Sequence, residues 1–159
     1  MSKLLILAVV ALLALFYYSD RTPDDLISGR AKVVDGDSLN FSNQRIRLFG
    51  IDAPEGKQMC IDTTGADYLC GRVAKIALSD FLGGQLIECQ QIDRDQYDRI
   101  VARCFLDDQD IASWMVVNGH ALAYREFSDD YIDEEDVART MKRGMWRGGF
   151  DPPWEWRRR

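Results

Sequence analysis

The sequence predicts a mainly β protein of the α+β class, in which five strands form a small closed barrel with three helices, preceded by an N-terminal hydrophobic helix. Short alternating segments separated by turn residues lie between residues 29 and 49 and again between 85 and 106. Helical spacing follows the third and fifth of these segments, which is an element order typical of small barrels. The 159 residues, 47% of them hydrophobic, suffice for one packed domain and exclude wholesale disorder.

The chain begins with a hydrophobic run. Leu4–Phe16 contains no charged or polar side chain, so its length suits either a short membrane anchor or the core of a signal peptide. Because the following residues offer a poor cleavage site, we expect 1–19 to be a signal anchor rather than a cleaved signal peptide or a buried helix. A polar linker is expected over 20–27, a folded domain over 28–148 and an aromatic, proline- and arginine-containing tail over 149–159.

Three strands are expected first. Ala31–Asp35 and Ser38–Phe41 are separated by the turn residues Asp35-Gly36-Asp37, and Arg45–Phe49 follows a tight turn at Ser42-Asn43. A helix over Asp67–Leu82 comes next, ended by paired glycines.

Two further strands and two further helices complete the prediction. The strands are separated by a polar loop, the first helix ends at a glycine, and the second helix begins with clustered acids that favour its N-terminus. The expected elements are strands Gln85–Gln91 and Ile100–Leu106 and helices Ile111–Asn118 and Asp130–Arg143.

The four cysteines favour an oxidising compartment. Cys60 and Cys70 lie ten residues apart and Cys89 and Cys104 fifteen, so pairing within each couple would close one local excursion of the chain. Free buried thiols are the alternative. Zinc is disfavoured because the chain has no CxxC pair and one histidine. We therefore expect two disulfides, and a protein that is anchored in the inner membrane and faces the periplasm, or is secreted if the signal is cleaved.

The charge distribution excludes one class of protein. The chain carries 20 basic and 26 acidic residues, and six of the acids lie in 129–136, which contains no base. Outside this acidic block the charges balance, so the chain is not a globally basic nucleic-acid binder. A phosphate-binding site remains compatible with this balance, because such a site needs only a few local cations.

Several residues suited to phosphodiester hydrolysis lie at strand ends and in loops. Carboxylates such as Asp37 and Asp52 suit a hard cation such as Ca²⁺, which polarises a phosphoryl oxygen. Arg47 and Arg99 can bind phosphate oxygens from two sides, and Glu55 can orient or deprotonate the attacking water. Each residue alone has an ordinary structural interpretation, and only their combination favours this chemistry.

The same motifs resemble a known family. VDGDSLNF, RLFGIDAPE, RDQYDR, VVNGHALAY and RGMW, between Gly29 and Trp146, are similar to the staphylococcal (thermo)nuclease-like domain. The resemblance implies a five-stranded OB-fold barrel with three helices, and a Ca²⁺-dependent endonuclease that acts on DNA and RNA and leaves 3′-phosphates. It implies a site consisting of the metal ligands Asp37, Asp52 and the Ala53 carbonyl, the catalytic residues Arg47, Glu55 and Arg99, and the substrate-binding Tyr97.

The sequence departs from the family pattern at one position, and it is compatible with two other functions. Asp98 stands where the family usually has glycine, and its carboxylate could repel a phosphate or pull Arg99 away. The first alternative is an OB-fold module that binds nucleic acid without cleaving it. The second is a membrane-tethered interaction domain that uses the acidic block as its contact surface. A nucleic-acid substrate is expected, and no protein partner is implied.

Overall fold

The computed structural model describes residues 26–41 and 44–159. The predicted N-terminal hydrophobic helix, and the turn predicted at Ser42-Asn43, therefore lie outside the described residues. Within the described part of the chain, no helix has both the length and the apolar character needed to cross a membrane.

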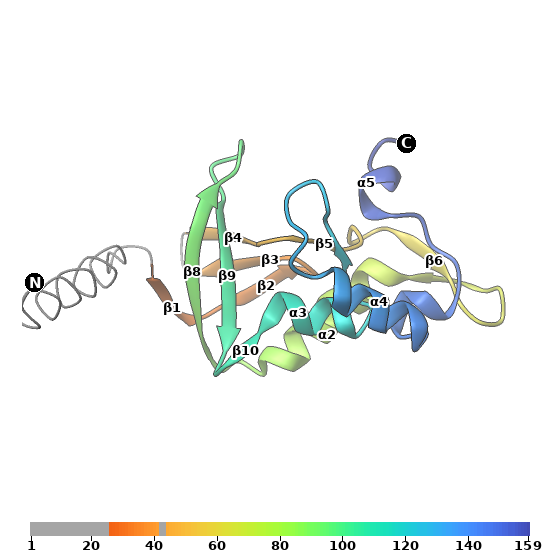
Figure 1. Ribbon diagram of the computed structural model, residues 1–159, viewed down its shortest axis with the longest axis horizontal. Helices are drawn as coiled ribbons and strands as arrows, with labels where there is room; N and C mark the ends of the chain where they lie inside the picture. The colour runs from red at the N-terminus through yellow and green to blue at the C-terminus, as the bar shows by residue number, and fades with distance from the viewer. Residues whose placement is uncertain (1–25, 42–43) are drawn as a thin grey trace, which may run out of the picture.

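A curled seven-stranded sheet forms the body of the protein (Figure 1). Its strands pair in the order β1-β8-β9-β4-β3-β2, with β10 added to β9, and all neighbours are antiparallel except β4 and β9. The strands are β1 (Leu26–Arg30), β2 (Lys32–Asp35), β3 (Ser38–Phe41), β4 (Gln44–Leu48), β8 (Leu86–Arg94), β9 (Ile100–Leu106) and β10 (Gln109–Asp110).

All five predicted strands are present, as β2, β3, β4, β8 and β9. These strands form a curled half-barrel sheet, which is consistent with the expected OB-like fold. Pairing among the described strands runs from β1 to β2, and only Ala31 separates these two strands in the chain. β1 begins at Leu26, two residues inside the expected linker, and pairs along its whole length with β8. Hydrophobic and polar side chains do not alternate along β1, so only this long-range pairing reveals it as a strand.

Two short strand pairs lie beside the main sheet. β5 (Ile51–Asp52) pairs with β11 (Leu122–Ala123), and β6 (Met59–Ile61) pairs with β7 (Asp67–Leu69). Because β7 takes the residues predicted to begin the first helix, that helix starts three residues later than expected.

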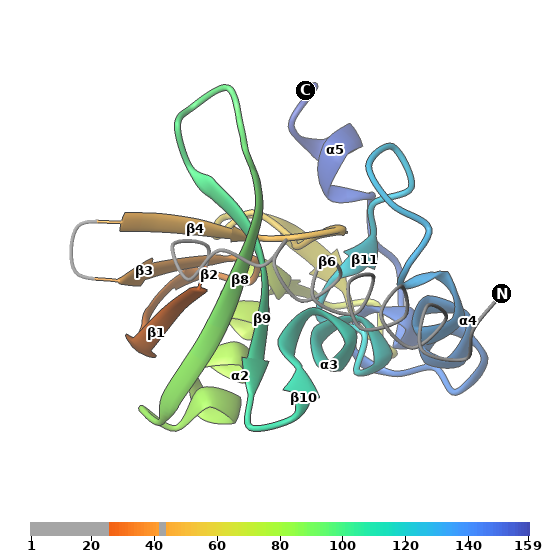
Figure 2. The same ribbon diagram turned by 60° about the vertical axis from the view of Figure 1, so that its left-hand side comes forward.

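Four helices are described, rather than the three predicted. Three of them match the predictions with shifted ends, and the fourth lies in the expected C-terminal tail. The helices are α2 (Cys70–Leu82), α3 (Ile111–Val117), α4 (Ile132–Thr140) and α5 (Pro153–Trp156), and a 3-10 turn spans Gly144–Arg147. Gly83 ends α2 in a left-handed conformation, as its sequence position predicts. In both ribbon views α5 lies on the opposite side of the molecule from α2 and α3 (Figures 1 and 2).

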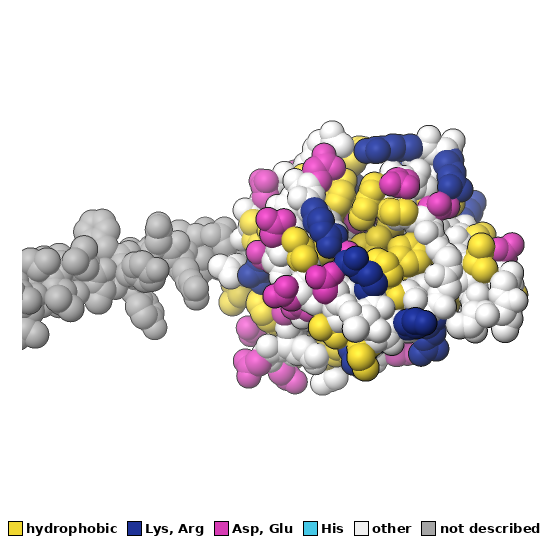
Figure 3. Space-filling view, turned by 45° about the vertical axis from the view of Figure 1, so that its right-hand side comes forward, with side chains coloured by type: hydrophobic (Ala, Val, Ile, Leu, Met, Phe, Trp, Pro, Cys, Tyr) yellow, Lys and Arg dark blue, Asp and Glu magenta, His cyan; other side chains and the backbone are white. Residues whose placement is uncertain are grey.

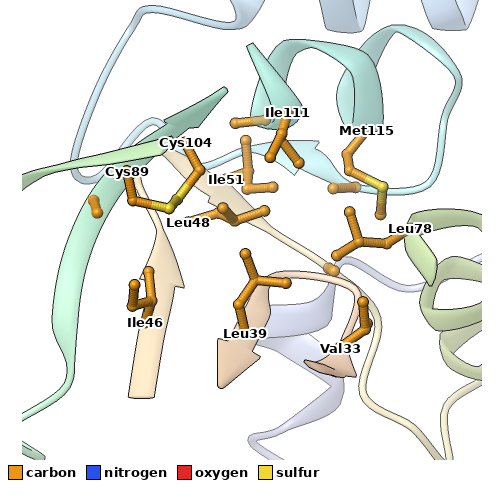
Figure 4. Packing of buried hydrophobic residues seen from close by; sticks show 14 of the residues in the cluster. Val33, Leu39, Ile46, Leu48, Ile51, Leu78, Cys89, Cys104, Ile111 and Met115 are labelled. Atoms are coloured by element: carbon orange, nitrogen blue, oxygen red, sulfur yellow. A yellow bond between two sulfur atoms is a disulfide. The ribbon is translucent and has the colours of Figure 1, made fainter. Parts of the chain in front are cut away.

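The main hydrophobic core fills the space between the curled sheet and helices α2 and α3 (Figure 4). Leu39 and Ile46 from the sheet, Leu78 from α2 and Met115 from α3 are fully buried there. A second, smaller cluster contains Cys60, Cys70, Leu122 and Met145, with aromatic residues of the C-terminal segment packed against it. This second cluster fixes the C-terminal segment to the body of the protein.

Both predicted disulfides are present. Cys60–Cys70 joins β6 to the first residue of α2, with a Cα–Cα distance of 5.6 Å. Cys89–Cys104 joins residues that face each other directly on β8 and β9. The expected pairing is therefore confirmed.

Candidate active site

The residues predicted to carry the chemistry meet in and beneath one cleft of about 830 Å³. Arg47 from β4, Glu55 from the loop after β5, and Tyr97 and Arg99 from the loop between β8 and β9 all line it. The tip of the β8–β9 hairpin and α5 rise on the same side of the molecule in both ribbon views (Figures 1 and 2). Asp37 and Asp52 are buried and reach this group of residues through Arg47.

Arg47 links the two buried carboxylates. Its Nη2 lies 2.8 Å from Asp52 Oδ1 and 3.2 Å from Asp37 Oδ2. Burial alone would lower the pKa of the Arg47 guanidinium, but the charges of Asp37 and Asp52 raise it overall. Arg47 therefore stays charged, with part of its side chain still open to the cleft.

The remaining contacts of Asp37 fix its orientation. Its Oδ1 accepts a hydrogen bond from the Ser38 hydroxyl at 2.9 Å, and its Oδ2 accepts one from the Ala53 N–H at 3.2 Å. The turn before β3 and the loop after β5 are therefore joined through one carboxylate. Burial raises the pKa of Asp52, an effect that its hydrogen bonds from Arg157 partly offset.

Two glycines allow the backbone to approach the site closely. A Cβ on Gly36 would lie 2.7 Å from the Ala53 Cβ, and a Cβ on Gly71 would lie 1.8 Å from the Glu55 carbonyl oxygen. The first contact packs the Asp37 turn against Ala53 in the loop after β5, and the second packs the start of α2 against the loop that carries Glu55. Both positions need glycine for lack of space.

Gln58 supports the Glu55 loop and was missed in the sequence analysis. Its side chain is fully buried, and its Oε1 accepts a hydrogen bond from the Glu55 N–H at 3.2 Å. Its Nε2 donates to the Asp151 carbonyl at 2.8 Å, which ties the loop to the C-terminal segment. The two partners are 93 positions apart in the sequence, so no local pattern predicts this link.

Arg99 is held by Asp95 rather than disturbed by Asp98. The Arg99 Nε donates to Asp95 Oδ2 at 2.6 Å, while Asp95 Oδ1 accepts from the N–H groups of Tyr97 and Arg99. Burial would raise the pKa of Asp95, but these hydrogen bonds lower it overall. The Asp98 carboxylate instead binds Arg94, so the expectation that Asp98 pulls Arg99 away was wrong.

Arg157, at the end of α5, was also missed as a site residue. Its Nη2 lies 2.7 Å from Asp52 Oδ2, and its Nη1 lies 3.1 Å from Asp52 Oδ1 and 2.8 Å from Glu55 Oε1. Tyr124 lines the same cleft and stacks on Trp154, with ring centroids 5.5 Å apart. The only sequence signal for Arg157 was a cluster of three terminal arginines, which does not indicate a partner 105 residues away.

The donor set fits a hard cation by its chemistry. Asp37, Asp52 and the Ala53 carbonyl would offer only oxygen ligands, which Ca²⁺ prefers. The described residues contain no group of three or more acidic, histidine or cysteine side chains placed to hold a metal, so water and phosphate would have to complete the coordination. In this structure the oxygens of Asp52 are bound by Arg47 and Arg157.

On the face shown in Figure 3, positive charge is local rather than continuous. Figure 3, in which the right-hand side of Figure 1 comes forward, shows basic side chains interleaved with acidic and hydrophobic ones. A polyanion would therefore be recognised by a few placed arginines and not by a continuous basic face.

Comparison with known proteins points to one family. A family model described as "Staphylococcal nuclease homologue" matches residues 45–148. The chain is 35% identical to a succinoglycan biosynthesis protein of Rhizobium meliloti over 86% of this chain and 73% of that protein. It is 33% identical to an Escherichia coli protein named "Uncharacterized endonuclease" over 84% and 86% of the two chains. It is 32% identical to an Oryza sativa protein named "Probable staphylococcal-like nuclease CAN2" over 77% of this chain and 31% of that protein.

Proposed function

Because the chain belongs to the staphylococcal nuclease family, we propose that it is a Ca²⁺-dependent endonuclease that hydrolyses DNA or RNA with little sequence preference. One observation carries the proposal: Arg47, Glu55 and Arg99, from three separate segments, line the same cleft. The curled sheet is compatible with an OB-like scaffold for this cleft.

The roles of the side chains follow from their chemistry. Arg47 and Arg99 bind the oxygens of the scissile phosphate, since guanidinium groups match phosphate geometry. Glu55 orients or deprotonates the attacking water. Asp37, Asp52 and the Ala53 carbonyl would hold Ca²⁺, which when bound polarises a phosphoryl oxygen.

Exposed aromatic side chains around the cleft support weak sequence preference. Tyr97 is 63% exposed and Phe127 67% exposed, and both line the cleft together with Tyr124. Aromatic rings stack on any base, so they bind single strands without reading sequence. Tyr97 also lies near Arg99, whose Cζ is 5.5 Å from the ring centroid, and can contact an adjacent phosphate.

The two disulfides support an oxidising, extracytoplasmic location. Whether residues 1–19 anchor the protein stays a prediction from sequence, because they lie outside the described residues.

The alternative of an acidic interaction surface has less support. Glu135, near the end of the acidic block 129–136, is buried and accepts hydrogen bonds from the Ala123 N–H at 2.7 Å and from Arg125 at 2.9 Å. Glu134 accepts from the Ser113 hydroxyl, and Asp130 pairs with Arg103. These three of the six acids of the block bind groups of neighbouring segments, which leaves fewer of them for an acidic contact surface.

The test uses the full chain, purified in mild detergent, with end-labelled denatured DNA and with RNA, in Ca²⁺ or in chelator. Ca²⁺-dependent cleavage that is lost in Glu55→Gln and Arg99→Ala but kept in Arg45→Ala supports the enzyme. Arg45 is the matched control, because it lies two residues before Arg47 on β4 and does not line this cleft. Binding of DNA without cleavage would instead establish the non-catalytic module.

A further inference from the structure

The C-terminal arm, residues 149–159, places a positive charge on the residues that the proposed chemistry needs. Arg157 contacts both oxygens of Asp52 and one oxygen of Glu55, at distances of 2.7 to 3.1 Å. Asp52 is one of the three expected metal ligands, and Glu55 is the residue expected to orient or deprotonate the attacking water. The arm therefore engages both groups at once.

The first part of the arm is firmly attached to the domain. Gly149 pairs with Ile61, and the Asp151 carbonyl accepts a hydrogen bond from Gln58. Pro153 is buried, and Trp154 packs on the second hydrophobic cluster and stacks on Tyr124. These contacts hold the arm beside the cleft whether or not Arg157 is bound.

The last three residues of the arm lie at the surface, where ion pairs of Arg157 with Asp52 and Glu55 and of Arg159 with Asp151 hold them. Arg157, Arg158 and Arg159 are exposed, and about a third of the Arg157 side chain is accessible to solvent. α5 has only four residues and ends at Trp156. A one-turn helix contributes little stability of its own, so the residues after Trp156 can separate from Asp52 while Trp154 stays in place.

The charges at the site disfavour binding of Arg157 and of a divalent cation to Asp52 at the same time. Asp37, Asp52 and Glu55 carry three negative charges, which Arg47 and Arg157 reduce to a net charge of −1. Removal of Arg157 from the site restores a second negative charge and frees Asp52 Oδ2, while Asp52 Oδ1 keeps its hydrogen bond from Arg47. A cation that used these oxygens would meet the Arg157 guanidinium at hydrogen-bond distance, where like charges repel strongly.

We propose that Arg157 is a built-in competitor for the divalent cation: the cation and the guanidinium occupy Asp52 alternately, and cation binding releases the tip of the arm from Asp52 and Glu55. This inference rests on the proposed Ca²⁺ requirement. The apparent dissociation constant for Ca²⁺ is then the intrinsic one divided by the fraction of molecules with the arm released. If the arm is docked in nine molecules of ten, removing Arg157 tightens Ca²⁺ binding about tenfold.

The first test measures Ca²⁺ affinity by calorimetry in the absence of nucleic acid, on the full chain at fixed ionic strength. Arg157→Ala is expected to bind Ca²⁺ about tenfold more tightly than wild type. Arg158→Ala loses the same charge from the same arm but no contact with Asp52, so its affinity should stay close to wild type. Arg157→Lys keeps the charge without the two-point contact and should fall between Arg157→Ala and wild type.

The second test follows the arm itself. Hydrogen exchange of the peptide that contains residues 153–159 should become faster on addition of Ca²⁺ in wild type, and should be fast and insensitive to Ca²⁺ in Arg157→Ala. Slower exchange with Ca²⁺ in wild type would overturn the proposal.

Failure of the inference can be distinguished from failure of the proposed function. If Arg157→Ala binds Ca²⁺ as wild type does but has a raised KM for DNA, Arg157 is a third phosphate-binding group and the competition is refuted. If neither protein binds Ca²⁺, the Ca²⁺ requirement of the proposed function fails, and the inference fails with it.

Discussion

Asp98 and Arg94 form an ion pair across the hairpin loop, with the Arg94 Nη1 2.9 Å from Asp98 Oδ1. This pair turns the Asp98 carboxylate away from the neighbouring Arg99, whose guanidinium is bound by Asp95. Asp98 adopts this position with a φ of 58°, a left-handed conformation that costs about 1 kcal/mol for a residue other than glycine. The loop therefore keeps Arg99 in place despite an added carboxylate, at some cost in backbone strain.

We expect Asp98→Gly to stabilise the protein by about 1 kcal/mol and to lower KM for DNA at low salt, because it removes a negative charge next to Arg99, which lines the cleft. Denaturant unfolding and initial rates measure the two effects. Asp107→Gly is the control, since Asp107 also has a positive φ, of 52°, but does not line the cleft. It should gain stability without a change in KM, and an equal fall in KM in both variants would refute the local charge effect.

Two substitutions of Arg47 should separate its effect on activity from its effect on stability. Arg47→Lys keeps the charge beside Asp37 and Asp52 but loses the planar fork, so kcat should fall about 10²-fold while the free energy of unfolding changes little. Arg47→Ala leaves the buried carboxylates with one cation fewer, and should cost about 3–5 kcal/mol in stability. Urea unfolding and single-turnover rates distinguish the effects. A lysine variant with wild-type kcat would contradict the proposed role.

The close approach of Gly71 to the Glu55 loop gives a packing prediction. Gly71→Ala places a methyl group against the Glu55 carbonyl, so we expect a loss of about 1–3 kcal/mol in stability and a loss of activity as the loop shifts. Gly56→Ala is the control, because a Cβ there meets nothing within 4 Å. The melting temperature and the nuclease rate should fall in Gly71→Ala and stay unchanged in Gly56→Ala. Equal behaviour of the two variants would mean that the loop adjusts freely.

Both disulfides should contribute to stability. Replacing Cys60 and Cys70 together by serine, or Cys89 and Cys104 together, should each cost about 2–4 kcal/mol, because the unfolded chain gains freedom. Reductant should lower the melting temperature of wild type and leave a variant that lacks both disulfides unchanged. An unaltered wild-type melting temperature in full reduction, verified by thiol titration, would contradict this expectation.

His120 gives a pH prediction. Burial lowers the pKa of His120 below its ordinary value of 6.5, and the ring stacks on Trp114. Since the unfolded chain binds the proton more readily, the contribution of His120 is complete above pH 6.5 and is lost as the pH falls from there through the lowered pKa. Denaturant unfolding at pH 7.5 and 5.5 should therefore show a smaller loss in His120→Gln than in wild type. An equal loss would show that other groups account for it.

Local signals in the sequence determined much of the fold. Alternating hydrophobic residues identified β2, β3, β4, β8 and β9, because each strand buries one of its faces. Cysteine spacing identified both disulfides, because each closes a short excursion of the chain. The positions of charged residues at strand ends identified the residues that line the cleft, since such positions project from a rigid scaffold.

The tertiary structure decided what no local pattern carries. β1 is a strand because β8 lies beside it, and residues 67–69 form β7 rather than the start of a helix because β6 pairs with them. Gln58 and Arg157 belong to the site only because the C-terminal arm folds back across it. Contacts between residues about a hundred positions apart form only in the assembled domain. The sequence near either residue therefore contains no pattern that predicts its partner.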